Sequence, residues 1–122
     1  MSETFLFDTY ALIELLNKNP KYEKYADCNT IVNEFIFAEF CYQLIKNEIS
    51  DYDEYLDEVE PAIVRLSPNT MKKAMEFRYK NKKRKMSMTD CISYIQAKEF
   101  GIKFLTGDKE FADLENVEFV KK

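Results

Sequence analysis

Histidine is absent from this 122-residue chain, and glycine and proline are scarce, with two and three copies. Without histidine the chain cannot form a Ser-His-Asp or Cys-His nucleophile system, a histidine-ligated zinc site or a histidine general base. The shortage of glycine and proline disfavours an all-β sandwich, whose many turns use these residues, and favours a helix-rich or α/β domain. Any enzyme chemistry must therefore rest on other residue types.

Cysteine is also rare, and Cys28, Cys41 and Cys91 are odd in number with no Cys-x-x-Cys spacing. Each lies among apolar residues, which favours a small buried side chain in a reducing compartment over a redox or metal role. No apolar run exceeds four residues, so the sequence predicts no membrane span. Glu3, followed by only three apolar residues before Asp8, is unlike a signal peptide. We therefore expect a cytoplasmic protein.

Length and charge further restrict the number of domains and the class of protein that the sequence allows. At 122 residues we expect a single domain, residues 1–122, with 46% hydrophobic and 15% aromatic residues to form its core. The net charge of −4, from 18 basic and 22 acidic residues, does not fit a protein that coats nucleic acid by bulk charge. The charge is uneven, however, because residues 51–60 hold six acids and residues 80–85 hold five bases.

Strand-like and helix-like segments alternate along the chain. The apolar spacing and the capping residues predict strands at 3–7, 30–32, 62–66, 102–106 and 117–120, and helices at 9–16, 34–46, 51–60, 69–81 and 87–100, with a short turn of helix at 21–25. Such alternation predicts an α/β fold with a four- to five-stranded, mostly parallel sheet covered by helices on both faces.

Four acids occupy positions that suit a common site. Asp8 and Asp108 each follow an apolar segment, at the carboxyl end of a predicted strand. Asp90 lies just inside a predicted helix start, and Glu39 lies on the long apolar helix. Ligands of open α/β sheets bind beyond the carboxyl ends of the strands. With no histidine available, clustered carboxylates point to a hard cation such as Mg²⁺ or Mn²⁺ and to metal-dependent phosphodiester chemistry.

Each acid also has a plainer interpretation. Asp8 is suited to cap the helix that follows it, and Asp108 to be an ordinary turn residue. Asp90 fits a capping box with Ser87, and Glu39 fits a solvent-facing stripe. A cap and a metal ligand are compatible roles, so the local pattern leaves both open.

A basic run immediately precedes the helix that carries Asp90. It is either a solvated helix end or a surface that holds phosphates, and the adjacent tyrosine is suited to stack on a base. The candidate RNA-contacting residues are Tyr79, Lys82, Lys83, Arg84 and Lys85.

Three segments of the chain match a known pattern. They are FLFDTYALIELL, which begins at Phe5, FIFAEF, which begins at Phe35, and SMTDCISYIQAKEFGIKFLTGDKEF, which begins at Ser87. In these segments the chain resembles PIN-domain nucleases, and among them the small single-domain ribonucleases of the VapC toxin type. The resemblance spans nearly the whole chain, although residues 50–85 carry no diagnostic motif.

The resemblance implies a site and a reaction. It implies that Asp8, Glu39, Asp90 and Asp108 form the catalytic site, that Asp8, Asp90 and Asp108 bind Mg²⁺ or Mn²⁺, and that Thr9 and Thr106 support them. It also implies an endoribonuclease that leaves a 5′-phosphate and a 3′-hydroxyl. A small antitoxin that covers the site and a homodimer are the implied protein partners. The role of Glu110 is open.

Two other functions remain compatible with the residues. One is a Mg²⁺-dependent phosphotransfer or phosphatase domain, which also places an aspartate after its first strand. Phosphatases of the haloacid-dehalogenase type have a second aspartate two residues later, where this chain has Tyr10. The other is a PIN-like module that binds partners without catalysis, against which the presence of all four acids argues.

Overall fold

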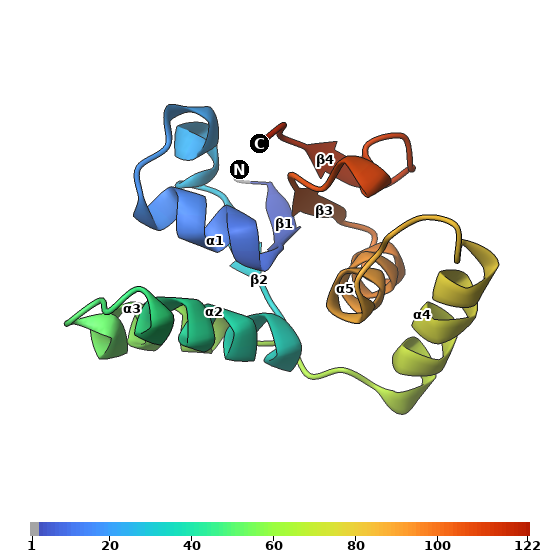
Figure 1. Ribbon diagram of the computed structural model, residues 1–122, viewed down its shortest axis with the longest axis horizontal. Coiled ribbons are helices and arrows are strands. Elements are labelled where there is room, and N and C mark those ends of the chain that lie inside the picture. The colour runs from blue at the N-terminus through green and yellow to red at the C-terminus, as the bar shows by residue number, and fades with distance from the viewer. Residues whose placement is uncertain (1–2) are drawn as a thin grey trace.

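Four short strands form one sheet in the computed structural model, which describes residues 3–122 (Figure 1). The strands are β1 (Thr4–Phe7), β2 (Asn29–Ile31), β3 (Lys103–Thr106) and β4 (Val117–Phe119), in the spatial order β2-β1-β3-β4. All three strand pairs are parallel. The two central strands, β1 and β3, are far apart in sequence and neighbours in space, which brings residues near position 8 close to residues near position 108.

Within the described residues 3–122, five α-helices connect and cover the strands. They are α1 (Thr9–Leu16), α2 (Glu34–Lys46), α3 (Tyr52–Val59), α4 (Pro68–Lys80) and α5 (Met88–Glu99). Polar side chains cap four of them: Asp8, Asn33, Ser67 and Ser87 each accept a hydrogen bond from a backbone amide of the first helical turn. At the start of α3 the N-cap residue, Asp51, makes no such side-chain hydrogen bond. Three short 3-10 helices, η1 (Pro20–Tyr25), η2 (Glu60–Ala62) and η3 (Lys109–Phe111), fill the connections.

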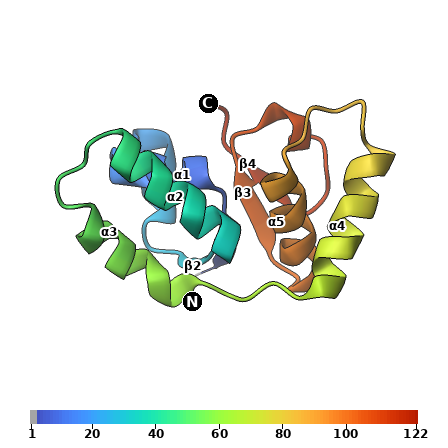
Figure 2. The same ribbon diagram turned by 60° about the horizontal axis from the view of Figure 1, so that its bottom comes forward.

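The helices lie in two groups on opposite sides of the sheet (Figure 2). In this view α1, α2 and α3 lie on one side, and α4 and α5 lie on the other. Helix α5 packs against both central strands, and α1 also contacts them. This arrangement confirms the expected α/β fold with a parallel sheet between helical layers.

The central strands are buried on both faces. Phe5, Leu6 and Phe7 of β1 and Phe104 and Leu105 of β3 are each 2% exposed or less. Parallel strands covered on both faces have continuous apolar sequences of this kind, because no face is left for polar side chains. The carboxyl ends of β1 and β3 are thereby held rigidly next to each other.

The strand expected at residues 62–66 is wrong in extent. Only Ile63 pairs, in an isolated parallel bridge to Val32 just beyond β2. The preceding residues are wound into η2, and the following ones lead into the proline that starts α4, so little extended backbone remains. Within residues 3–122 no helix is long and apolar enough to cross a membrane.

Candidate active site

The carboxyl ends of β1 and β3 lie side by side and place two acids at one edge of the sheet. Phe7 is in register with Leu105, and the Asp8 amide donates to the Leu105 carbonyl oxygen at 3.0 Å. Asp8 and Asp108 therefore leave the same edge from neighbouring strands, as the sequence predicted.

Asp8 both caps a helix and faces the candidate site. Its Oδ1 atom accepts a hydrogen bond from the Ala11 amide at 2.7 Å, and its side chain is buried. Burial raises the pKa of Asp8, while the Thr106 hydroxyl, two backbone amides and the positive charge of Lys122 act in the opposite direction. The capping interpretation of Asp8 is therefore correct, and capping by Oδ1 does not exclude a second role for the carboxylate.

Asp108 lies in a tight polar turn at the end of β3. The Asp108 amide donates to Thr106 Oγ1 at 3.1 Å, and Asp108 Oδ1 accepts from the Glu110 amide at 3.0 Å. Thr106 thus contacts Asp108 through its hydroxyl and also hydrogen-bonds with Asp8. The Glu110 backbone carbonyl accepts from Arg84 at 2.7 Å, which fixes the segment after Asp108 to the loop before α5.

Asp90 lies at the start of α5 and has a strongly raised pKa. Ser87 caps α5 by accepting from the Asp90 amide at 3.0 Å, and α5 packs on the central strands. Burial, followed by the charges of Asp8 and Asp108 and then that of Glu39, raises the pKa of Asp90 to about 7. All four predicted acids therefore share one electrostatic environment.

Glu39 approaches the site from α2. Its Oε1 atom accepts a hydrogen bond of 2.7 Å from the hydroxyl of Thr9, the first residue of α1. Glu39 is exposed and borders an open hollow of about 680 Å³ between α1 and α2, to which Tyr10 and Tyr42 also contribute. Glu39 is thus the solvent-facing member of the four acids.

A divalent cation suits these residues by donor type and by charge. Carboxylate oxygens are hard ligands, and the pKa of Asp90 is raised first by burial and then by the negative charges of Asp8 and Asp108, which a cation would offset. Within residues 3–122, however, no three acidic or cysteine side chains are close enough to form a ready-made metal group. A Mg²⁺ ion commonly keeps several of its waters and takes only one or two carboxylates directly, so the arrangement fits such an ion.

The basic run before α5 has partners of its own. Tyr79 is 69% exposed, and the Lys82 ammonium lies 4.2 Å from the centre of its ring. Arg84 makes two hydrogen bonds to the Asp113 carboxylate, at 2.8 and 2.9 Å. Tyr79, Lys82, Arg84 and Lys85 border a hollow of about 520 Å³, and Lys83 is exposed. The RNA-contact role of this run stays a prediction.

Two features of the site have no clear signal in the sequence. Lys122 is far from the acids along the chain, but its charge acts on Asp8 and its ammonium lies 4.5 Å from the centre of the Tyr10 ring. Asn33, the N-cap of α2, also donates to Ser93 Oγ at 3.0 Å and to Gln96 Oε1 at 3.1 Å. This buried network fixes α2 against α5, and so fixes the backbone of Glu39 relative to that of Asp90.

The fold and the site define a class of protein: a parallel α/β domain with carboxylates at the carboxyl edge of its two central strands. The family model for the PIN domain matches residues 5–117. The chain belongs to the PIN domain family. No curated protein matches it in sequence.

Solved structures share the fold over nearly their whole length. The chain is similar to a toxin-antitoxin complex from Klebsiella pneumoniae, with a TM-score of 0.74 at 17% identity, covering 97% of this chain and 99% of that one. It is also similar to VapC20 of Mycobacterium tuberculosis, a Sarcin-Ricin loop cleaving toxin, with a TM-score of 0.72 at 14% identity and coverage of 97% and 99%. VapBC2 of Rickettsia felis, bound to a DNA fragment from its promoter, gives 0.72 at 17% identity with 98% of each chain covered.

Proposed function

We propose that the protein is a Mg²⁺- or Mn²⁺-dependent endoribonuclease whose catalytic site consists of Asp8, Glu39, Asp90 and Asp108. The observation that carries this proposal is that β1 and β3 bring Asp8 and Asp108 to one edge of the sheet, close enough to Asp90 that, after burial, their charges and that of Glu39 raise its pKa. Carboxylates that raise one another's pKa concentrate negative charge at one place, and a divalent cation neutralises such charge. Membership of the PIN domain family supports the assignment to a nuclease.

The proposed roles follow from how each acid is held. Asp8, Asp90 and Asp108 hold the ion directly or through water, and Thr106 orients the first and the last of them. When bound, the ion lowers the pKa of a water molecule and offsets charge on the phosphate. Glu39, oriented by the Thr9 hydroxyl, positions the attacking water or takes its proton. Attack on phosphorus with departure of the 3′ oxygen leaves a 5′-phosphate and a 3′-hydroxyl.

The basic run supplies a candidate surface for the RNA strand. Lys82, Lys83 and Lys85 are exposed on the loop that leads into α5, next to the exposed Tyr79. Ammonium groups neutralise phosphates, and a tyrosine ring stacks on a base of any identity. Arg84 contributes its positive charge from a fixed position, because Asp113 and the Glu110 carbonyl hold its guanidinium.

We also propose that this nuclease is the toxin of a toxin-antitoxin pair, that a small antitoxin covers the site, and that the toxin forms a homodimer in the cytoplasm. Solved toxin structures that share the fold support the antitoxin partner. The exposed apolar side chains of Tyr42 and Ile45 on α2, 63% and 55% exposed, are a candidate protein-binding surface beside Glu39.

The test is cleavage of a mixed set of single-stranded and structured RNAs in Mg²⁺, in Mn²⁺ and in EDTA. We expect the wild-type protein to cut only with metal and the variant Asp90→Asn to lose at least about a hundredfold in rate. The matched control is Asp57→Asn on the exposed face of α3, which should keep full activity. Cutting that survives EDTA or survives Asp90→Asn would contradict the proposal.

Two further measurements separate the remaining functions. Hydrolysis of a phosphomonoester without RNA cleavage would assign the site to phosphotransfer or phosphatase chemistry. Metal binding by titration with neither activity would identify a module that binds partners without catalysis.

A further inference from the structure

A second basic surface lies beside Asp108 and shares no lining residue with the hollow next to the run at residues 80–85. It is an open hollow of about 620 Å³, bordered by Asp108, Lys109, Phe119, Lys121 and Lys122. We call it the C-terminal hollow. Its size is within the range of sites that hold small ligands, and one nucleotide fits such a volume. It shares Asp108 with the candidate active site.

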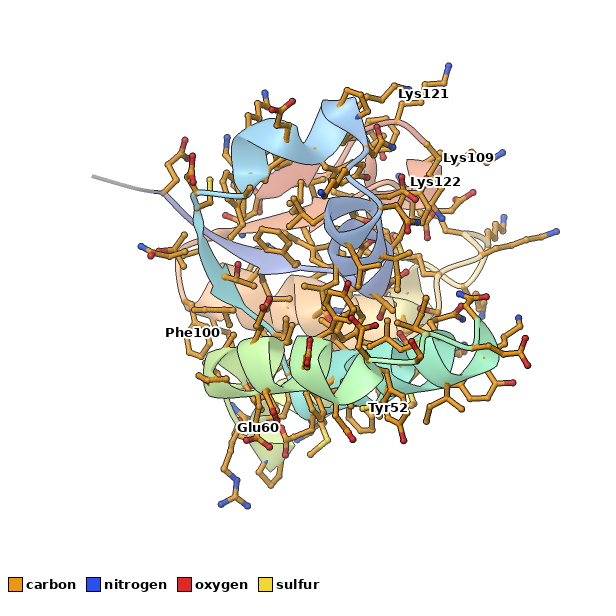
Figure 3. The ribbon with its side chains drawn as sticks, turned by 90° about the vertical axis from the view of Figure 1, so that its left-hand side faces the viewer. Tyr52, Glu60, Phe100, Lys109, Lys121 and Lys122 are labelled. Carbon is orange, nitrogen blue, oxygen red and sulfur yellow. The ribbon has the colours of Figure 1, made fainter. Side chains whose placement is uncertain are left out.

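The C-terminal hollow is bordered by three lysines and by one acid, Asp108. Among residues 3–122, none of the ammonium groups of Lys109, Lys121 and Lys122 forms an ion pair. Lys103, on the neighbouring strand β3, is paired with Glu118 instead. Figure 3 shows the three unpaired lysines projecting from one corner of the molecule. Their charge is available to an anion from outside.

Lys122 connects the C-terminal hollow to the acids. Its side chain crosses Gly107 so closely that a Cβ atom there would lie 2.9 Å from Lys122 Cγ, and its ammonium lies 4.5 Å from the centre of the Tyr10 ring. Its positive charge acts on Asp8. One border of the hollow is therefore a cation at the edge of the acid cluster.

Phe119 adds an aromatic surface to the same hollow. It is the last residue of the edge strand β4, and it is 36% exposed. Lysines beside an exposed aromatic ring form the usual combination that binds single-stranded nucleic acid, with charge on the phosphates and the ring against a base.

We propose that the C-terminal hollow is a subsite for single-stranded RNA, which holds the nucleotide next to the scissile phosphate through Lys109, Lys121, Lys122 and Phe119. This inference rests on the proposed nuclease function and adds to it the position of the substrate. Four clustered acids repel a polyanion, so a strand approaches them only where flanking cations offset that repulsion. The three lysines provide this offset immediately beside Asp108.

The experiment measures RNA binding in EDTA, where the proposed reaction cannot occur. A short fluorescein-labelled single-stranded RNA of mixed sequence is titrated with protein, and fluorescence anisotropy gives the Kd between about 50 and 200 mM salt. The test variant combines Lys109→Gln, Lys121→Gln and Lys122→Gln, because glutamine removes the charge and keeps most of the stem that packs over Gly107 and Tyr10. The control variant combines Lys18→Gln, Lys46→Gln and Lys72→Gln. These three lysines are exposed outside the C-terminal hollow, and their replacement changes the net charge by the same amount.

We expect the test variant to bind about tenfold or more weakly at low salt, and its slope of log K against log salt to be smaller by about 2, at roughly 0.7 for each lost phosphate contact. The control variant should keep the wild-type slope. Phe119→Ala should weaken binding about tenfold with little change in slope, while Phe100→Ala, an exposed phenylalanine on another face, should not. Lys122→Arg, which keeps the charge, should bind like the wild type.

The subsite is overturned if the two triple variants show the same Kd and slope, whatever their activity with metal. If the test variant alone loses affinity and slope but the wild type cuts no RNA in Mg²⁺ or Mn²⁺, the subsite stands and the proposed nuclease function fails. If the wild type cuts, the test variant should have a raised KM with kcat retained at saturating RNA. A lowered kcat with an unchanged KM would contradict the subsite.

Discussion

The Thr9 hydroxyl donates a hydrogen bond of 2.7 Å to the Glu39 carboxylate. This contact joins the start of α1 to the middle of α2 across thirty positions of sequence. Because Thr9 directly follows Asp8, the same turn of backbone carries one candidate metal ligand and orients the exposed acid of the site.

Removal of that hydroxyl should therefore affect catalysis more than stability. We expect Thr9→Val to lower kcat for RNA cleavage about tenfold, since Glu39 loses the group that fixes its orientation, and to lower the free energy of unfolding by only about 1 kcal/mol. Thr9→Ser, which keeps the hydroxyl, is the matched control. Rate measurements and urea unfolding of both variants check this. Equal losses of activity in Thr9→Val and Thr9→Ser would contradict the orienting role.

The pKa of Asp90 predicts how stability depends on pH when no metal is present. Its carboxyl has a pKa of about 7 in the folded protein against a reference value of 3.8, so the native state binds more protons than the unfolded state between these values. The contribution of this carboxyl to the free energy of unfolding is therefore greatest at low pH, and it is lost as pH rises toward 7. The ionised carboxylate costs on the order of 2 to 4 kcal/mol at pH 8.

The variant Asp90→Asn should remove this dependence. We expect it to be more stable than the wild type at pH 8 and about equal to it near pH 4, where the carboxyl is protonated in the native state and largely protonated in the unfolded state, measured by urea unfolding in EDTA. Asp57→Asn should keep the wild-type profile. If the free energy of unfolding changes by the same amount between pH 4 and pH 8 in the wild type and in Asp90→Asn, the raised pKa of Asp90 is contradicted.

A bound metal ion should restore the stability that the native state loses when these acids ionise. A ligand present at a hundred times its Kd stabilises the native state by about 2.7 kcal/mol, so Mg²⁺ or Mn²⁺ should raise the Tm at pH 8 and EDTA should reverse the rise. In Asp8→Asn and in Asp108→Asn the rise should be much smaller, because each variant lacks a carboxylate of the proposed set. Thermal unfolding at several metal concentrations measures this, and an equal rise in the wild type and in both variants would contradict metal binding at this edge.

Part of the site could be predicted from local sequence. The apolar runs that end at Asp8 and near Asp108 identify the buried strands, and the carboxyl ends of parallel strands meet at one edge. The capping residues of α1, α2 and α5 are likewise local signals, and each makes its expected hydrogen bond.

The rest depends on contacts that no local pattern encodes. The contact between Lys122 and Tyr10 arises because the segment after β4 returns across the edge of the sheet, and the bonds from Asn33 to Ser93 and Gln96 span 60 and 63 positions. The strand expected at 62–66 was wrong because strand-like composition alone does not provide a pairing partner. Its residues have strand-like composition, but only Ile63 finds a neighbour with which to pair.

The Asn33 network predicts a large cost for a small substitution. Asn33 is fully buried, caps α2 by accepting from the Ile36 amide at 2.9 Å, and bonds to Ser93 and Gln96 through its Nδ2 atom. Asn33→Ala leaves these buried groups without partners, so we expect a loss of about 3 kcal/mol in the free energy of unfolding. The control is Asn29→Ala, at an exposed position of β2. Losses below about 1 kcal/mol in Asn33→Ala would show that water replaces the network.

Gly107 provides a test of how the segment after β4 is placed over the site. An added Cβ atom would lie 2.9 Å from both Lys122 Cγ and the Val120 carbonyl oxygen, and 3.2 Å from the Tyr22 hydroxyl. The lysine stem moves easily and the backbone carbonyl does not, so Gly107→Ala should lower the free energy of unfolding by about 1 to 3 kcal/mol. It should also weaken RNA cleavage by displacing Asp108. Adding Lys122→Ala should restore only a minor part of the stability, because Val120 still obstructs. Full restoration in the double variant, measured by urea unfolding, would mean that the lysine stem alone sets the close approach.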